Sequence, residues 1–240
     1  MSPTTPAFPS RLPNVGTTIF TVMSALATQH KAVNLGQGFP DFDCDPKLVD
    51  GVTAAMQQGH NQYPPMPGVP ALRQAIAAKI EAVYARQYSA DTEITITAGA
   101  TQAILTAILC CVGPGDEVIV LEPCYDSYVP NIELTGATVV RVPLTPGTFR
   151  PDFDKIGAAL SPKTRAIIIN SPNNPSGTVW SPEDMRRLDE LLAPTNVLVI
   201  SDEVYEHMVY APLRHESVAR YPGLAARSFI VSSFGKTYHV

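Results

Sequence analysis

The sequence predicts an α/β protein in which a mostly parallel sheet is covered by helices on both faces. From residue 93 onward, short apolar runs rich in β-branched residues alternate with stretches of helical character. These runs are apolar almost throughout, which is typical of strands buried on both faces of a parallel sheet. The length also fits, because 240 residues with 45% hydrophobic side chains suffice for one large domain or two small ones.

The N-terminal part of the chain precedes this alternation. Residues 1–16 are expected to form an extended arm. Two loops, 34–45 and 61–70, are interrupted by Gly and Pro, and four prolines among residues 61–70 exclude regular structure there. Helices are predicted before, between and after these loops, at Thr17–Lys31, Lys47–Gln58 and Pro70–Tyr88.

The rest of the chain supplies the sheet and the helices that cover it. Strands are predicted at Glu93–Thr97, Glu117–Leu121, Thr138–Val142, Ala166–Asn170, Val197–Ser201 and Ser228–Ser232. Helices are predicted between most of these strands, at Thr101–Val112, Tyr125–Leu134, Phe153–Leu160 and Pro182–Leu192. Strands that alternate with helices in this way form a parallel sheet, and ligands bind beyond the carboxyl ends of its strands.

Composition and charge exclude several classes of function. The net charge is −5 and no basic run occurs, so nucleic acid is not an expected partner. No apolar stretch reaches the length of a membrane span, and residues 1–13 lack the apolar core of a signal peptide. The four cysteines show no metal-ligand spacing, so we expect no metal site and a reducing, cytoplasmic location.

Chemically useful side chains follow several of the predicted strands. Residues 98–101, which contain Gly99, Ala100 and Thr101, open a helix, and the free N–H groups of a helix start can hold a phosphate; an ordinary turn is the alternative. Tyr125 can stack on a flat ring or simply pack at the edge of the core. Asn174 lies in a Pro-stiffened loop, where it can donate to an oxygen or merely form an Asn-Pro turn.

Two charged residues complete this edge of the sheet. Asp202 follows a buried strand, where a carboxylate is costly unless it meets a cation; the alternative is a helix N-cap. Lys236 follows the last strand after small residues, and a lysine there can form a Schiff base with an aldehyde cofactor, although most lysines are solvated surface charges. Each alternative is plausible alone, but all of them together on one sheet edge are much less so.

The chain resembles the class I/II aminotransferases of fold type I, which depend on pyridoxal phosphate, and within them the bacterial methionine and kynurenine–glutamine branch. Several motifs in the same order carry this resemblance over residues 12–240. They are NLGQGFPDFD (34–43), NQYPPMPGVPALRQAI (61–76), TAGATQAI (97–104), NSPNNPSGTV (170–179), SDEVYEHMVY (201–210) and SSFGKTYH (232–239).

The resemblance implies a role for each matching position. Lys236 binds the cofactor covalently and then serves as the base that moves the Cα proton, and Asp202 pairs with the pyridinium nitrogen. Asn174 and Tyr205 hydrogen-bond the phenolic oxygen, and Tyr125 stacks on the ring. The remaining matches are the phosphate-site positions Gly99, Ala100, Thr101 and Ser233, Tyr63 at the site of a partner subunit in a homodimer, and Gly38 with Asn174 near the substrate.

The same resemblance divides the chain and shows where it departs from the family. Residues 1–45 are expected to be an N-terminal arm and small-domain segment, and residues 46–240 a cofactor-binding large domain. Relatives continue past the lysine into the rest of the sheet, a C-terminal small domain and an arginine that binds the substrate carboxylate. We therefore expect residues 1–240 to be an incomplete aminotransferase that by itself binds the cofactor weakly and does not transaminate.

Two other functions stay open at this point. A lyase that cleaves a C–S bond at Cβ shares the fold, the cofactor and the first proton removal, and its products separate it from a transaminase. An inactive fragment or regulatory module would usually have lost the lysine or the aspartate, and both are present here as Lys236 and Asp202.

Overall fold

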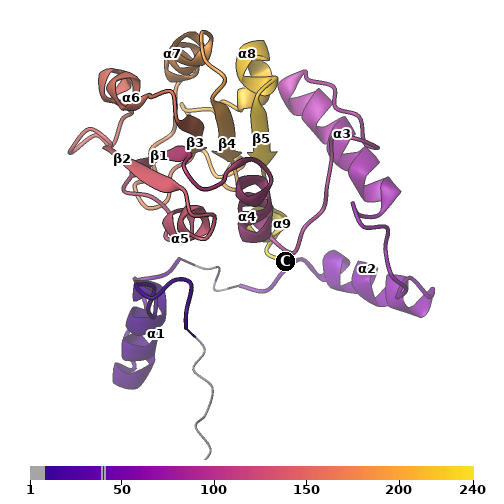
Figure 1. The fold of residues 1–240 in the computed structure, drawn as a ribbon. Helices are drawn as coiled ribbons and strands as arrows, with labels where there is room; N and C mark the ends of the chain where they lie inside the picture. Colours follow the sequence, from indigo (N-terminus) through magenta and orange to yellow (C-terminus); the bar gives the residue numbers. More distant parts are fainter. Residues whose placement is uncertain (1–8, 39, 41) are drawn as a thin grey trace, which may run out of the picture.

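Five strands form one parallel sheet in the order β2–β1–β3–β4–β5 in the computed structural model, which describes residues 9–38, 40 and 42–240 (Figure 1). Helices cover both faces of this sheet, so the predicted α/β fold class is confirmed. The strands are β1 (Glu117–Glu122), β2 (Thr138–Pro143), β3 (Thr164–Asn170), β4 (Leu198–Asp202) and β5 (Ser228–Val231).

The register of the central strands aligns the polar residues at their carboxyl ends. Ile168 of β3 lies opposite Ile200 of β4, and the same register places Asn170 opposite Asp202. Both isoleucines are almost fully buried because helices pack on each face of the sheet. The chain order reverses between β1 and β3, and a crevice at such a reversal is the usual ligand site of an open parallel sheet.

Two groups of helices form the layers on either side of the sheet. Alternate residues of β1 point to opposite faces, so Val118 and Val120 pack in one core while Ile119 and Leu121 pack in the other. The first core includes residues of α4 (Ala100–Cys111) and α5 (Tyr128–Glu133). The second includes residues of α6 (Phe153–Ala159), α7 (Pro182–Leu192), the short η1 (Val218–Arg220) and α8 (Pro222–Ala225).

The three helices predicted before residue 93 are present, and they lie at the periphery of the molecule. The helices α1 (Ile19–His30) and α2 (Pro46–Gln57) bury none of their residues, whereas α3 (Pro70–Tyr84) buries Arg73 and Tyr84 (Figure 1). The third helix was predicted to reach Tyr88, but it ends earlier because Ala85 adopts a left-handed conformation with φ 56°. Among the described residues, no helix is long and apolar enough to cross a membrane.

The predicted strand at 93–97 is wrong. Its residues form no ladder with a described strand, and the N–H of Ile96 instead donates to the carbonyl of Pro67 at 3.0 Å. The segment packs closely on the proline-rich loop, since a Cβ on Gly68 would lie 2.3 Å from Cγ1 of Ile96. An apolar alternating run becomes a strand only where a neighbouring strand offers its N–H and C=O groups.

Three local differences bear on the candidate site. The helix predicted from Tyr125 begins only at Tyr128, so Tyr125 lies in the loop that follows β1. A short helix that was not predicted, α9 (Phe234–Tyr238), follows β5 and contains Lys236. Asp202 is the last residue of β4 instead of the first residue after it.

Candidate active site

Asp202 is the buried acidic group at the carboxyl end of the sheet. Its side chain accepts two hydrogen bonds, from the hydroxyl of Tyr128 to Oδ2 at 2.5 Å and from the backbone N–H of Val204 to Oδ1 at 3.2 Å. Burial raises the pKa of Asp202, and the hydrogen bonds and the nearby charge of Lys236 only partly offset this effect. The site therefore favours a further positive charge beside this carboxylate.

Asn170 fixes the loop that follows β3 against the end of β4. Its Nδ2 donates to the carbonyl of Asp202 at 2.9 Å, and its Oδ1 accepts from the backbone N–H of Asn174 at 2.6 Å. A side-chain amide with one donor and one acceptor used in this way cannot rotate without breaking both bonds. Asn170 thus sets the position of Asn174 relative to Asp202.

Tyr205 lies close to three of the other predicted site residues. Burial raises the pKa of its phenol, the charges of Asp202 and then Tyr125 raise it further, and a hydrogen bond with the Asn174 amide lowers it. Tyr128 connects two of these residues, because its hydroxyl donates to Asp202 and its ring meets that of Tyr125 edge-on at 5.7 Å. Half-buried Tyr205 thus leaves its hydroxyl beside an amide at the same sheet edge.

Lys236 belongs to the same group of residues. Its Nζ lies 5.7 Å from the centroid of the Tyr205 ring, and its charge acts on Asp202. Ser233 caps the short helix α9 by accepting from the N–H of Gly235 at 3.2 Å. The lysine side chain is exposed in the described chain, so an incoming molecule has access to it.

The turn before α4 supplies an open helix start. Gly99 is the N-cap residue with φ 84°, and no atom lies within 4 Å of the position that a Cβ would occupy. Thr97 Oγ1 donates to the carbonyl of Gly99 at 2.9 Å and holds the turn. The N–H groups of the first helical turn, including those of Ala100 and Thr101, have no intrahelical acceptor, which suits an anion.

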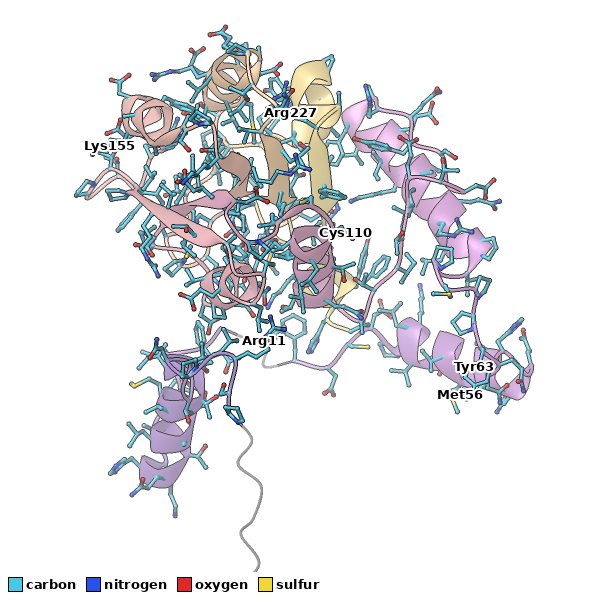
Figure 2. All side chains as sticks on the ribbon, in the orientation of Figure 1. Arg11, Met56, Tyr63, Cys110, Lys155 and Arg227 are labelled. Carbon is cyan, nitrogen blue, oxygen red and sulfur yellow. The ribbon has the colours of Figure 1, made fainter. Side chains whose placement is uncertain are left out.

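Two predicted residues are not brought to this group within the described chain. Tyr63 is 99% exposed on the loop between α2 and α3 and projects from the edge of the molecule (Figure 2). Gly38 has no neighbouring atom within 4 Å of a Cβ position. The loop that contains Gly38 does approach α9, because the ring of Phe42 meets that of His239 edge-on at 5.4 Å. The roles of Tyr63 and Gly38 stay predictions.

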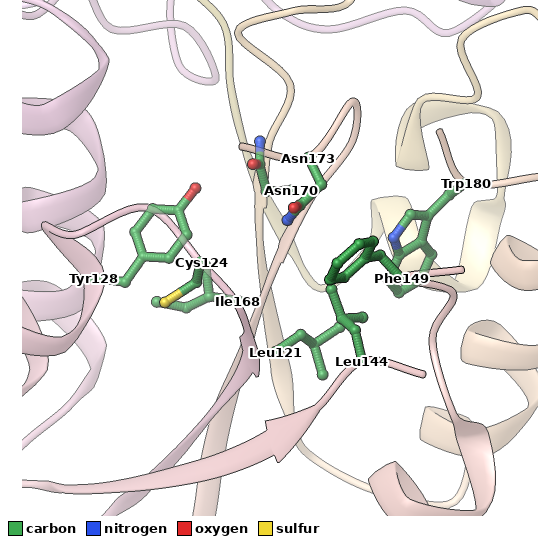
Figure 3. Close-up of a pocket in the computed structure, with 9 residues that line it drawn as sticks. All are labelled: Leu121, Cys124, Tyr128, Leu144, Phe149, Ile168, Asn170, Asn173 and Trp180. Carbon is green, nitrogen blue, oxygen red and sulfur yellow. The ribbon is translucent and has the colours of Figure 1, made fainter. Parts of the chain in front are cut away.

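A small cavity lies next to Tyr128 and Asn170. Its volume is about 10 Å³, which is far too small for a cofactor ring. Tyr128, Asn170 and Trp180 contribute to its wall together with Cys124 (Figure 3). Burial, with the charge of Glu122, raises the pKa of the Cys124 thiol to about 11, so this cysteine is not a ready nucleophile.

Sequence inspection missed two residues of this site, Tyr128 and Asn170. Tyr128 follows Tyr125 by three residues, but the predicted helix over 125–134 gave it no distinct role. Asn170 ends an apolar run and was counted only as the last residue of a strand. The polar side chain of Asn170 at the end of a buried apolar strand could have identified it as a site residue, because buried polar side chains need hydrogen-bond partners.

Comparison with known proteins identifies the family of this chain. The family model for aminotransferase class I and II matches residues 30–240. The chain belongs to this family. Class I and II aminotransferases in general depend on pyridoxal phosphate.

Individual relatives agree with this assignment. Methionine aminotransferase of Escherichia coli is 52% identical over 231 residues, which cover 96% of this chain and 60% of that protein. The probable N-succinyldiaminopimelate aminotransferase DapC of Mycobacterium tuberculosis is 47% identical, with 96% and 58% covered. Kynurenine–oxoglutarate transaminase 3 of Rattus norvegicus is 35% identical, with 96% and 53% covered.

Solved structures show the same similarity in three dimensions. YbdL from Escherichia coli, reported with a methionine aminotransferase function, superposes with a TM-score of 0.94 at 52% identity, covering 98% of this chain and 62% of that one. N-succinyldiaminopimelate aminotransferase from Mycobacterium tuberculosis gives 0.92 at 46% identity, covering 97% and 61%. This chain therefore spans about 60% of the length of these relatives.

Proposed function

We propose that this protein binds pyridoxal 5′-phosphate at the carboxyl end of the sheet and transfers an amino group between an L-amino acid and a 2-oxo acid. The observation that carries the proposal is that Lys236, which follows β5, lies beside Asp202 and Tyr205, which stand at the end of β4. The amino donor we propose is methionine or another large apolar or aromatic amino acid, with kynurenine and glutamine as further candidates. A methionine aminotransferase and a kynurenine–oxoglutarate transaminase are among the relatives named above.

The residues present fit this cofactor. The raised pKa of buried Asp202 signals a carboxylate that lacks a full positive partner, and a protonated ring nitrogen would be that partner. The open helix start at Gly99 fits a phosphate group. The paired amide and phenol of Asn174 and Tyr205 fit an oxygen on the ring.

Each residue then has a distinct task in the reaction. When bound, pyridoxal phosphate supplies an electron sink that stabilises negative charge at the substrate Cα. Asp202, held by Tyr128 and Val204, would pair with the protonated ring nitrogen, and Tyr125 would supply an aromatic face for the ring. Lys236 would hold the cofactor through its amine, and the same amine would serve as the general base for the Cα proton of the substrate.

Further parts of the proposal concern assembly and location. We propose a homodimer in which Tyr63 reaches the site of the partner subunit, with residues 1–45 as arm and small-domain segment and 46–240 as the cofactor-binding domain. The exposed apolar side chains of α1 support an assembly, since isolated helices rarely leave such a face to water. A cytoplasmic location stays a prediction.

The deciding experiment combines chemical trapping with product analysis. Borohydride reduction followed by peptide mapping should place the cofactor on Lys236 and not on Lys79, which is engaged with Glu206 at 2.6 Å. A 2-oxo acid together with the aminated cofactor indicates transamination. Ammonia and pyruvate would instead indicate the C–S lyase, and attachment to another lysine would refute the site.

Replacing Tyr128 with phenylalanine is expected to raise the dissociation constant for pyridoxal phosphate about tenfold. The substitution removes a hydrogen bond to a charged group while keeping the ring in the core, and such bonds contribute about 1.5–3 kcal/mol. Tyr221→Phe is the matched control, because Tyr221 donates to Glu216 at 3.0 Å outside the site. Equal affinity of the Tyr128 variant and this control in an absorbance titration would contradict the role of Tyr128.

A further inference from the structure

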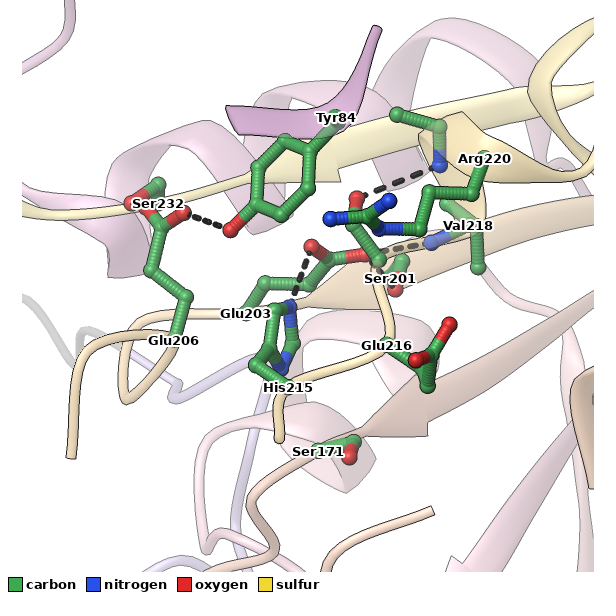
Figure 4. A network of polar contacts seen from close by, with 12 residues as sticks. Tyr84, Ser171, Ser201, Glu203, Glu206, His215, Glu216, Val218, Arg220 and Ser232 are labelled. Carbon is green, nitrogen blue, oxygen red and sulfur yellow. Dashed lines mark hydrogen bonds and ion pairs between the residues drawn. The ribbon is translucent and has the colours of Figure 1, made fainter. Parts of the chain in front are cut away.

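Glu206 is a buried carboxylate just beyond β4 that receives hydrogen bonds from several directions. Its side chain is 3% exposed, and Lys79 Nζ lies 2.6 Å from its Oε1. The hydroxyl of Tyr84 donates to Oε2, and that of Ser232 donates to Oε1 (Figure 4). Burial alone would raise the pKa of Glu206, but the hydrogen bonds from Lys79, Ser232 and Tyr84 outweigh it and lower the pKa. The carboxylate is therefore ionised at neutral pH.

The donors to Glu206 come from two separate parts of the fold. Lys79 and Tyr84 lie on α3, whereas Ser232 follows directly after β5. The next residue, Ser233, caps α9, and Lys236 lies within that short helix. Fixing the Ser232 hydroxyl on a buried carboxylate therefore fixes the start of the segment that presents Lys236.

Backbone hydrogen bonds also join the turn after β4, which contains Glu206, to the end of β5. The N–H of Glu203 donates to the carbonyl of Val231 at 2.8 Å, and the N–H of Glu206 donates to the carbonyl of Glu203 at 2.9 Å. Tyr205 lies inside this turn, and Lys236 Nζ is 5.7 Å from the centroid of its ring. The two contacts hold the segment of Tyr205 against the segment of Lys236.

We propose that Glu206 is a positioning residue for Lys236: through Ser232 it sets where the lysine amine stands relative to Tyr205. The inference rests on the proposed function, in which Lys236 binds the cofactor. A carboxylate suits this task because its two oxygens accept from several donors at once. Lys79 supplies the opposite charge that makes the burial of Glu206 tolerable.

The test uses the complete gene product loaded with pyridoxal phosphate. Glu206→Gln removes the charge at nearly constant shape, and Ser232→Ala removes only the hydroxyl that reaches it. Each is expected to raise the dissociation constant for the cofactor about tenfold and to change the visible circular dichroism of the bound cofactor. The double variant should bind the cofactor as tightly as Glu206→Gln alone, because both substitutions break the same contact between Ser232 and Glu206. Ser232→Thr, which keeps the hydroxyl, should restore the affinity and the spectrum.

The controls separate positioning from simple loss of stability. Glu216→Gln removes the partner of Tyr221 away from Lys236 and should leave the affinity and the spectrum unchanged. If Ser232→Ala lowers only the melting temperature, or if the two effects add fully in the double variant, the positioning role is wrong. Should Glu206→Gln fold poorly, Ser232→Ala and Ser232→Thr still decide. If borohydride traps the cofactor on Lys236 but Glu206→Gln has the same affinity and spectrum as Glu216→Gln, only the positioning role of Glu206 is wrong. If the wild-type protein gives no adduct at Lys236, the proposed function is wrong, and the positioning role is wrong with it.

Discussion

Replacing Lys236 with alanine in the complete gene product is expected to lower the rate of transamination about 10⁴-fold. The substitution removes the amine that attaches the cofactor and also the base that takes the Cα proton, and a general base alone contributes about 10²–10⁴. Because Lys236 is exposed at the end of the sheet, a small primary amine added to the solution can enter its place. Steady-state rates with and without methylamine measure both effects, and partial recovery is expected.

The matched control is a lysine of similar exposure outside the site. Lys155 on α6 pairs with Asp152 at 2.9 Å on the opposite side of the molecule from Tyr63 (Figure 2), and Lys155→Ala should keep the wild-type rate. A Lys236→Ala protein that retains activity within tenfold of wild type would show that another group is the base. Loss of activity in both variants would point to a general effect on folding.

Local sequence pattern was enough to predict the sheet but not every strand. The runs that became β3 and β4 contain continuous apolar stretches, residues 166–169 and 198–200, and this property is independent of what lies next to them. The 93–97 segment also has a strand-like pattern, because apolar Ile94 and Ile96 alternate with polar residues. It forms no ladder with a described strand, because its neighbour is the proline-rich loop. A strand requires a partner, and the partner is set by the tertiary structure and not by the run itself.

The candidate site shows the same division between local and non-local information. Asp202 and Lys236 could be singled out because each stands at a predictable place, the end of a strand. The contact of Tyr128 with Asp202 joins residues 74 positions apart, and that of Tyr84 with Glu206 joins residues 122 apart. Neither follows from spacing, since the approach of the segments is decided by how the helices pack on the sheet.

Replacing Asp202 with asparagine is expected to lower kcat/KM about 10²–10³-fold while it stabilises the cofactor-free protein. The activity falls because asparagine has no charge to hold a proton on the ring nitrogen, and losing one preorganised electrostatic partner has effects of about this size. Stability rises because the buried carboxylate lacks full compensation when the cofactor is not bound. Residues that serve a ligand in this way often cost stability in its absence.

The pH dependence of stability tests the predicted stabilisation of the cofactor-free protein by Asp202→Asn. Burial raises the pKa of Asp202 in the folded state, so the folded protein holds the carboxyl proton more tightly than the unfolded chain does. Wild type therefore loses stability as pH rises from the ordinary aspartate range through the raised pKa, whereas Asp202→Asn does not. Thermal unfolding of both cofactor-free proteins should show a higher melting temperature for the variant at neutral pH, and this advantage should disappear in acid.

Asp184 offers the contrasting case of a buried aspartate with a cation. It pairs with Arg150 and accepts hydrogen bonds from Ser181, so its charge is compensated within the chain. Asp184→Asn is therefore expected to destabilise the protein, because it leaves the guanidinium without its partner. If Asp202→Asn destabilises the cofactor-free protein as Asp184→Asn does, then Asp202 is a structural aspartate, and its place at the end of β4 no longer argues for a cationic ligand.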